Sequence, residues 1–293
     1  YLIYIALTLI LTVLLLCGDM NLFESLLHAF GTAGTGGFAM HPYSVEFFSP
    51  YSQYVIAIFM IIFGINFSLF YLILIGNVKE VIKNEELKLY FGIIIVSVII
   101  IGINVYSIYQ NVEQTFRVAL FQVATIISTT GYSTADFNSW PVLSKTILMV
   151  LMVFGSCAGS TAGGIKCSRI VIIIKSAIRK LKAMINPRKV ETIRVDKKPI
   201  TDDTISSVHS FVIVYIVVFL LCAIIVSFDP MKNNDFTTSL TASLACISNI
   251  GPGLGAVGPY GSFADYFELN DATKKWLLKY KSVFDFDGEN PEK

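Results

Sequence analysis

The run Ser128-Thr129-Thr130-Gly131-Tyr132 follows a mostly apolar segment at 116–127, and the same arrangement occurs twice more. The other two copies read Gly34-Thr35-Gly36-Gly37-Phe38, after an apolar segment at 22–30, and Ser248-Asn249-Ile250-Gly251-Pro252, after one at 236–247. Aligned without gaps, the glycines at 37, 131 and 251 coincide, and Thr, Thr and Asn stand two residues before them. Self-similarity of this kind predicts a repeated structural unit.

Longer apolar runs separate the three clusters. Five such runs contain no charged residue, at 2–17, 54–75, 89–109, 146–165 and 210–227. A bilayer core of about 30 Å needs about 20 apolar residues in helical form, so these runs are predicted to span a membrane. The run at 2–17 opens at the first residue without a preceding positive charge, which suggests a start inside a longer protein rather than a signal peptide.

The composition agrees with a membrane protein. Apolar residues make up 54% of the 293 residues, charged residues 15%, and the mean hydropathy is +0.67. Soluble domains carry about 25% charged residues, so a disordered chain, a disulfide-rich secreted module and a nucleic-acid-binding domain are excluded. The five cysteines show no metal-ligand spacing and are interpreted as buried thiols.

Basic residues are concentrated between the runs. The segment 166–198 holds 11 of the 22 Lys and Arg residues, and a smaller group lies at 79–88, whereas 18–50 has none. The positive-inside rule therefore places 76–88 and 175–206 in the cytoplasm, and 18–50 and 110–141 outside.

The short apolar segments are too short to span and are predicted to be re-entrant helices that end in the Thr-x-Gly clusters. Carbonyl groups of successive residues can replace the hydration shell of a cation, and glycine permits the backbone that this requires. The helix carboxyl ends add partial negative charge. A single glycine of this kind is more simply a tight turn or a packing residue, but three at matched positions favour a cation filter.

A glycine-rich stretch interrupts the apolar run at 146–165. It reads Gly155-Ser-Cys-Ala-Gly159-Ser160-Thr161-Ala-Gly163-Gly164-Ile-Lys166. It differs from a nucleotide-binding P-loop because Ile165 precedes the lysine and no strand precedes the loop. We interpret 155–166 as a flexible intramembrane loop beneath the filter that acts as a gate, with a packed kink as the alternative.

These motifs resemble a known family. The repeated helix–pore-loop–helix plan, the run from Thr129 to Phe137 with Trp140-Pro141 behind it, the stretch 159–166 and the run Asn249-Ile-Gly-Pro-Gly-Leu-Gly255 are similar to the Trk/Ktr/HKT superfamily of potassium transporters. Within it, bacterial Trk membrane subunits are the nearest match, and the resemblance covers residues 1 to about 275.

The resemblance implies an all-α, multi-pass protein of the cytoplasmic (inner) membrane, with pseudo-fourfold, potassium-channel-like architecture that is incomplete in this chain. It implies K⁺ uptake through backbone carbonyls, no cofactor, a homodimer, and a cytoplasmic nucleotide-binding regulatory subunit. The filter residues would be Thr35, Gly36, Gly37, Thr129, Thr130, Gly131, Asn249, Ile250 and Gly251. The gating loop would include Gly155, Gly159, Ser160, Thr161, Gly163, Gly164 and Lys166.

The sequence is also compatible with other functions. A sodium-permeable or sodium-coupled transporter of the same fold is the alternative, as is a fragment that does not conduct alone. Nucleic acid is not an expected partner. Enzymatic chemistry is not expected, because His28, His41 and His209 are scattered and no H-E-x-x-H or G-x-S-x-G motif occurs.

The chain is expected to divide at the clusters and loops. The second-repeat unit would occupy 1–77, a cytoplasmic loop 78–88, the third repeat 89–186, a cytoplasmic connector 187–206, the first helix and pore loop of the fourth repeat 207–270, and a polar tail 271–293. The first repeat and the last helix of the family plan are expected to be missing, and the tail is too polar to span.

Overall fold

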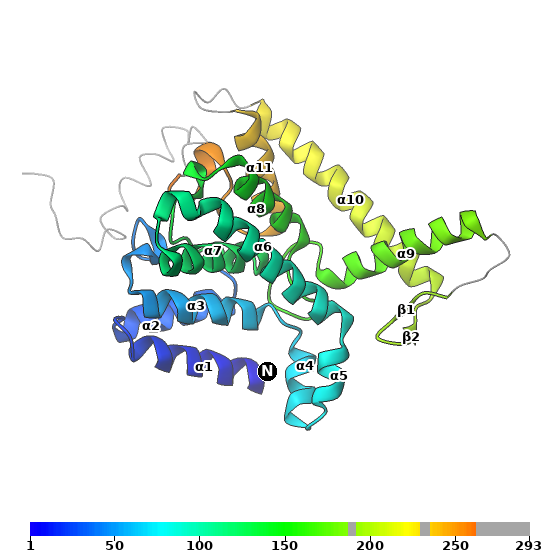
Figure 1. Ribbon diagram of the computed structural model, residues 1–293, viewed down its shortest axis with the longest axis horizontal. Coiled ribbons are helices and arrows are strands. Elements are labelled where there is room, and N and C mark those ends of the chain that lie inside the picture. Colours follow the sequence, from blue (N-terminus) through cyan, green and yellow to red (C-terminus); the bar gives the residue numbers. More distant parts are fainter. Residues whose placement is uncertain (187–191, 229–234, 262–293) are drawn as a thin grey trace, which may run out of the picture.

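A computed structural model describes residues 1–186, 192–228 and 235–261 (Figure 1). The described part is helical apart from a small hairpin, in which β1 (Arg194–Val195) pairs antiparallel with β2 (Lys198–Pro199). The expected polar tail at 271–293 lies outside the described residues. The α-helices are α1 Leu2–Leu16, α2 Leu22–Ala33, α3 Pro50–Phe63, α4 Phe67–Leu74, α5 Val78–Lys83, α6 Glu85–Tyr109, α7 Val112–Ile127, α8 Val142–Phe154, α9 Cys167–Ile185, α10 Asp202–Ser227 and α11 Phe236–Ser248.

Two of the predicted spanning segments are single long helices. In the described part of the chain, α6 and α10 are long and apolar enough to cross a membrane. The apolar helices α1 and α8 have 15 and 13 residues, which is shorter than the usual span of about 20. The predicted interruption of the run 146–165 is present, because α8 ends at Phe154 and α9 begins only at Cys167.

The run 54–75 was predicted to be one spanning segment, and the structure divides it into two helices. It forms α3 and α4, which meet at an angle of 91° across a short break. Asn66 caps α4 by accepting a hydrogen bond of 2.9 Å from the amide of Ser68. A Cβ at Gly64 would lie 2.2 Å from the Tyr90 hydroxyl, so the backbone approaches α6 closely there. Hydropathy does not register either feature, because the segment as a whole remains apolar enough to span.

The three short helices α2, α7 and α11 begin at capping residues. Asn21, Asn111 and Asp235 each accept a hydrogen bond from a backbone amide three residues later, as N-cap side chains do. In the gap-free alignment of the clusters, Asn21 and Asp235 coincide, whereas α7 begins one turn earlier. The three helices therefore share their carboxyl ends rather than their full length.

Helix α7 lies between α3 and α6 in the main body of the molecule (Figure 1). One hydrophobic cluster joins it to α6 and α8 through residues such as Val123 and Ile126. A second cluster joins it to α1, α2 and α3 through Phe121 and Ala124. Ten residues of α7 are buried, and every residue from Phe121 to Ile127 is among them, so the second half of this short helix is enclosed by protein. Such enclosure suits a re-entrant helix, whose irregular end must be covered at membrane depth.

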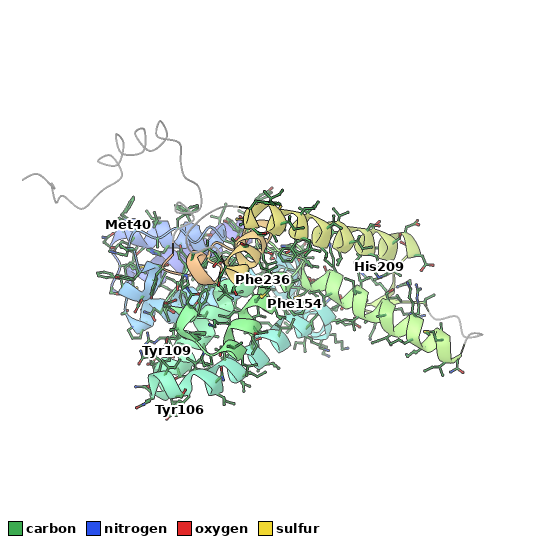
Figure 2. All side chains as sticks on the ribbon, turned by 90° about the horizontal axis from the view of Figure 1, so that it is seen from above. Met40, Tyr106, Tyr109, Phe154, His209 and Phe236 are labelled. Carbon is green, nitrogen blue, oxygen red and sulfur yellow. The ribbon has the colours of Figure 1, made fainter. Side chains whose placement is uncertain are left out.

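Helices α9 and α10 extend together away from this body, as Figures 1 and 2 both show. Only 6% of the apolar stretch of α10 is buried, so its apolar side chains face outward. Outward apolar side chains along a spanning helix are typical of contact with lipid or with another membrane segment.

Candidate functional site

The three Thr-x-Gly clusters adopt the same backbone at the ends of α2, α7 and α11. A left-handed residue closely follows each helix: φ is 51° at Thr35 and 55° at Thr129, each two residues after its helix, and 57° at Asn249, directly after α11. The next amide then bonds back five residues, from Gly36 to Gly31 at 2.7 Å, from Thr130 to Thr125 at 3.0 Å, and from Ile250 to Ala245 at 2.9 Å. This is the Schellman arrangement, which closes a helix and turns the chain away from its axis.

Threonine is an unusual residue in the left-handed region. Asn tolerates positive φ, but a β-branched residue there is strained. Thr35 and Thr129 are both buried and both hold this conformation. Each threonine hydroxyl bonds to the loop 155–166. Thr129 Oγ1 accepts from the Gly163 amide at 2.6 Å, and Thr35 Oγ1 donates to the Thr161 carbonyl at 3.3 Å. These contacts hold the strained backbone in place.

The glycines of the clusters allow the three segments to touch. Gly37, Gly131 and Gly251 have φ of 67°, 90° and 109°, which side chains disfavour. A Cβ at Gly37 would lie 2.0 Å from the Thr130 carbonyl oxygen, and one at Gly131 would lie 2.1 Å from that of Ile250. The second cluster therefore packs against the third, and the third against the fourth, by the same glycine-to-carbonyl step. The structure thus brings all nine residues that the sequence singled out into one continuous site.

Polar side chains surround this site. Ser128 and Thr130 are buried, and their hydroxyl oxygens lie 2.7 Å apart. Tyr132 is buried above α2, and a Cβ at Gly31 would lie 2.2 Å from its hydroxyl oxygen. The cluster that ends α7 is therefore anchored on α2 as well as on its own helix.

The loop 155–166 is folded back on itself. The amides of Lys166 and Cys167 donate to the carbonyls of Phe154 and Ser156 at 3.0 and 2.9 Å, which closes the base of the loop. Gly155, Gly159, Gly164 and Lys166 have positive φ, between 65° and 75°. The Lys166 ammonium group bonds to the Ala162 carbonyl inside the loop. The loop is therefore an ordered element with its own internal contacts.

The loop reaches the ends of all three short helices. Besides its bonds to Thr35 and Thr129, a Cβ at Gly163 would lie 2.1 Å from the carbonyl oxygen of Ser248, the last residue of α11. Ser156 Oγ also donates to the Ile127 carbonyl at 2.8 Å. The other surface of the loop, at 159–161, lines a cavity of about 770 Å³ together with Tyr4, Phe67 and Tyr71. The loop therefore stands between the three clusters and an open space.

Sequence reasoning placed Ser248 at the start of the third cluster without a role, and it missed Tyr215. The Ser248 hydroxyl lies 2.6 Å from the Tyr215 hydroxyl of α10, which ties the end of α11 to a spanning helix. Tyr215 is a polar group within an otherwise apolar run, which was the available signal.

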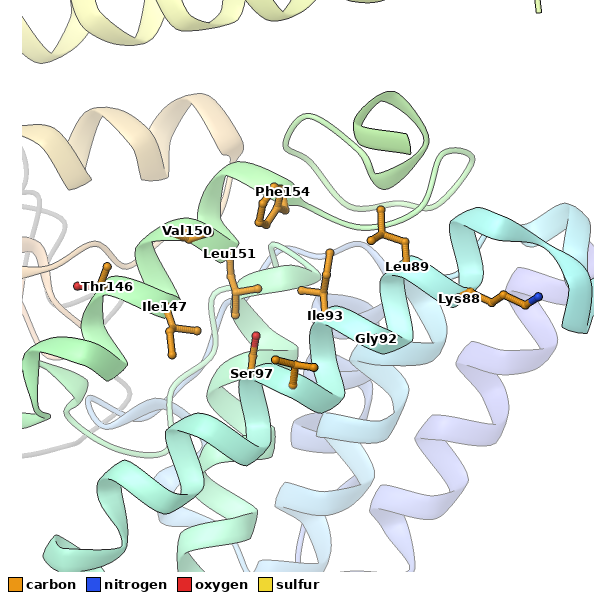
Figure 3. Close-up of a pocket in the computed structure, with 11 residues that line it drawn as sticks. Lys88, Leu89, Gly92, Ile93, Ser97, Thr146, Ile147, Val150, Leu151 and Phe154 are labelled. Carbon is orange, nitrogen blue, oxygen red and sulfur yellow. The ribbon is translucent and has the colours of Figure 1, made fainter. Parts of the chain in front are cut away.

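A second cavity lies apart from the clusters. It has a volume of about 440 Å³ between α6 and α8, and its walls are apolar side chains such as Ile93, Ile147 and Leu151 (Figure 3). None of the nine cluster residues lines this cavity. This cavity is therefore separate from the cation filter that the sequence predicts at the clusters.

Comparisons with known proteins agree with this architecture. A family model described as TrkH, cation transport protein, matches residues 1–272. The Trk system potassium uptake protein TrkH of Escherichia coli (strain K12) is 30% identical over 288 residues, which cover 97% of this chain and 58% of that protein. The protein of the same name from Vibrio parahaemolyticus is also 30% identical, over 96% of this chain and 58% of its own length. The chain thus spans about 58% of the length of these curated relatives.

A solved structure is similar over nearly the whole chain. The crystal structure of the potassium transporter TrkH from Vibrio parahaemolyticus matches with a TM-score of 0.82 and 28% identity. The match covers 96% of this chain and 60% of that one.

Proposed function

Because this chain belongs to the TrkH family of cation transport proteins, we propose that it carries most of a pathway for K⁺ uptake across the cytoplasmic membrane. The curated relatives are named as potassium uptake proteins, which favours K⁺ over the sodium-permeable alternative. The proposal concerns the complete protein, because this chain spans only part of the length of its relatives.

The observation that carries the proposal is the convergence of three helix ends. The nine cluster residues Thr35, Gly36, Gly37, Thr129, Thr130, Gly131, Asn249, Ile250 and Gly251 would offer backbone carbonyl oxygens to a dehydrated cation. Carbonyl oxygens can replace the hydration shell of K⁺, and helix carboxyl ends contribute partial negative charge. The site does not require a buried carboxylate, which would be costly at membrane depth.

The order in which the three clusters touch one another supports a ring. Gly37 faces the Thr130 carbonyl and Gly131 faces that of Ile250, so each step repeats the last. A fourth cluster, which the family resemblance implies, would close a pseudo-fourfold filter. The repeat units would then be those expected from the sequence, with the first units at 1–77 and 89–186 and the last beginning at 207.

The loop 155–166 would be the gate. It touches the ends of α2, α7 and α11 from one side and lines a cavity on the other. A loop in that position would block an ion that leaves the filter. The residues expected to form the gate are Gly155, Gly159, Ser160, Thr161, Gly163, Gly164 and Lys166.

Two partners remain proposals. A cytoplasmic nucleotide-binding subunit would meet the basic segment that includes α9 and the hairpin. A second copy of the protein, or lipid, would cover the outward apolar side of α10, of which little is buried. A homodimer is the arrangement that the family resemblance implies.

The filter is tested by Gly131→Ser in the complete transporter, expressed in cells deficient in potassium uptake. The new Cβ would collide with the Ile250 carbonyl at a backbone angle unfavourable to serine, so ⁸⁶Rb⁺ uptake or K⁺/Na⁺ selectivity should fall at least tenfold. Gly102→Ser on α6 is the matched control, because a Cβ there meets no atom within 4 Å. Unchanged uptake and selectivity in Gly131→Ser would refute the filter assignment.

A further inference from the structure

Glu86 is a buried carboxylate in the first turn of α6, with only 7% of its surface exposed. A buried carboxylate is costly unless donors satisfy it. Its donors come from the loop region: Glu86 Oε1 accepts from the amide of Ala158 at 2.6 Å and from that of Ser168 at 2.9 Å. The same oxygen therefore binds the first arm of the loop and the start of the helix that follows it.

The two amides lie at different structural positions. Ala158 is in the first part of the loop, and Ser168 is in the first turn of α9, directly after the loop. Amides in the first turn of a helix have no partner within the helix, and a carboxylate there also interacts favourably with the helix dipole. Charge-assisted hydrogen bonds of this length are about twice as strong as neutral ones. Glu86 thus joins the first arm of the loop, at Ala158, to the start of α9, at Ser168.

The next turn of α6 continues the same contact. Tyr90 lies four residues after Glu86, on the same face of the helix. Its hydroxyl donates to the Ile61 carbonyl at 3.1 Å and leaves no room for a Cβ at Gly64. The Cys157 amide in turn donates to the Gly64 carbonyl at 3.0 Å. One face of α6 therefore supports both broken segments, the α3–α4 break and the loop.

The start of α6 is held from the cytoplasmic side by the hairpin. Asp196 in the hairpin turn accepts from the Asn84 side chain at 2.7 Å and from the Glu85 amide at 2.8 Å. Glu85 also forms an ion pair with Lys175 of α9. The two residues before Glu86 are therefore fixed by the hairpin, while Glu86 itself holds the loop.

We propose that Glu86 is the positioning residue that keeps the loop 155–166 beneath the clusters, and that the hairpin stabilises this position through Asp196. The proposal rests on the proposed function of the loop as a gate. Glu86 does not touch the ion; it acts through the backbone of the loop. Loss of the two hydrogen bonds of Glu86 frees the first arm of the loop and the start of α9 together. Displacement of the hairpin loosens the first turn of α6, which carries Glu86.

Two native thiols report the position of the loop. Cys157 lies in the first arm of the loop, Cys167 directly follows the loop, and both are fully buried. The complete transporter is prepared with every other cysteine replaced by serine and is placed in proteoliposomes. We compare Glu86→Ala and Glu86→Gln with the control Glu80→Ala, which removes an exposed acid from α5. The measurements are the rate of alkylation by N-ethylmaleimide and the flux of ⁸⁶Rb⁺.

Glu86→Ala should speed alkylation of Cys157 and Cys167 at least tenfold and should raise flux, with K⁺/Na⁺ selectivity unchanged. Glu86→Gln should give intermediate rates, because its amide oxygen still accepts hydrogen bonds without the charge. If Cys157 and Cys167 were alkylated in Glu86→Ala at the wild-type rate, the proposal would be overturned. Faster alkylation without a change in flux would leave Glu86 as the positioning residue and would refute the loop as the gate, so the two failures are distinguishable.

The hairpin is tested by a double-mutant cycle. Asp196→Ala should speed alkylation less than Glu86→Ala, and the double variant should react no faster than Glu86→Ala alone. Independent, multiplicative effects would show that Asp196 does not act through Glu86 and would overturn that half of the proposal. Should Glu86→Ala fail to fold, as judged by size-exclusion chromatography, Glu86→Gln and Asp196→Ala decide the question by the same rates.

Discussion

The amide of Gly163 donates a 2.6 Å hydrogen bond to the hydroxyl of Thr129, and this bond joins the loop 155–166 to the end of α7. Thr129 holds a left-handed backbone that its β-branched side chain disfavours. The bond therefore has two effects: it fixes the strained residue, and it seats the loop against the cluster. The same two effects recur, with a longer bond, at Thr35 and Thr161.

Thr129→Val is expected to loosen the loop. Valine keeps the shape and the β-branch, so the strain remains, but the Gly163 amide loses its acceptor. An unsatisfied buried amide costs about 1–3 kcal/mol, so the thermal midpoint should fall and ⁸⁶Rb⁺ flux should rise. Thr146→Val is the control, because that hydroxyl is exposed and bonds within its own helix. Equal midpoints and fluxes in the two variants would contradict a structural role for the Thr129 hydroxyl.

Asn249→Val is expected to destabilise the end of α11. Asn249 has φ 57° and ψ 49°, a left-handed conformation that asparagine tolerates. A β-branched residue there should cost about 1–2 kcal/mol, whereas Asn249→Gly should be nearly neutral. Thermal unfolding of the purified protein compares the two variants. A valine variant as stable as the glycine variant would show that the left-handed backbone is not retained.

The convergence of the three clusters could be predicted from the sequence because its signal is local. Gly37, Gly131 and Gly251 carry the cluster pattern on their own, and the predicted interruption after Phe154 is present. The bend between α3 and α4 was missed, since Gly64 and Asn66 act through a contact with α6 and a cap that hydropathy does not register. The role of Glu86 was also missed, because its partners are backbone amides more than 70 residues away. Backbone groups carry no sequence signal.

Deletion of residues 159–164 is expected to raise ⁸⁶Rb⁺ flux through the complete transporter. The deleted segment contains the contacts to Thr35, Thr129 and Ser248 and the wall of the adjoining cavity. An ion leaving the clusters would then meet a shorter obstacle. Flux in proteoliposomes is measured beside K⁺/Na⁺ selectivity, which should stay as in the wild type because the clusters are intact. Unaltered flux would favour the view that 155–166 is a packed kink.

Asp19 is expected to make the stability of the folded protein depend on pH. It follows α1, and its carboxylate accepts hydrogen bonds from the amide and hydroxyl of Ser49, at 2.7 and 2.6 Å, and from the Ser52 hydroxyl. Partial burial acts to raise the pKa of Asp19, but these hydrogen bonds outweigh it and lower the pKa below its ordinary value. They favour the ionised form in the folded protein.

A lowered folded-state pKa fixes the sign of the effect. The stabilisation is fully present above the ordinary aspartate pKa of about 3.9 and is lost as the pH falls through the lower folded-state value. Asp19→Asn should therefore have a lower thermal midpoint than the wild type at pH 7, and the gap should narrow below about pH 4. Asp203→Asn, which removes an exposed acid at the start of α10, controls for the loss of a negative charge. Only a contribution that depends on ionisation is lost with acid. If the difference in thermal midpoint between Asp19→Asn and the wild type stayed constant from pH 7 to pH 3, the hydrogen bonds, and not the charge of Asp19, would hold the end of α1 against the start of α3.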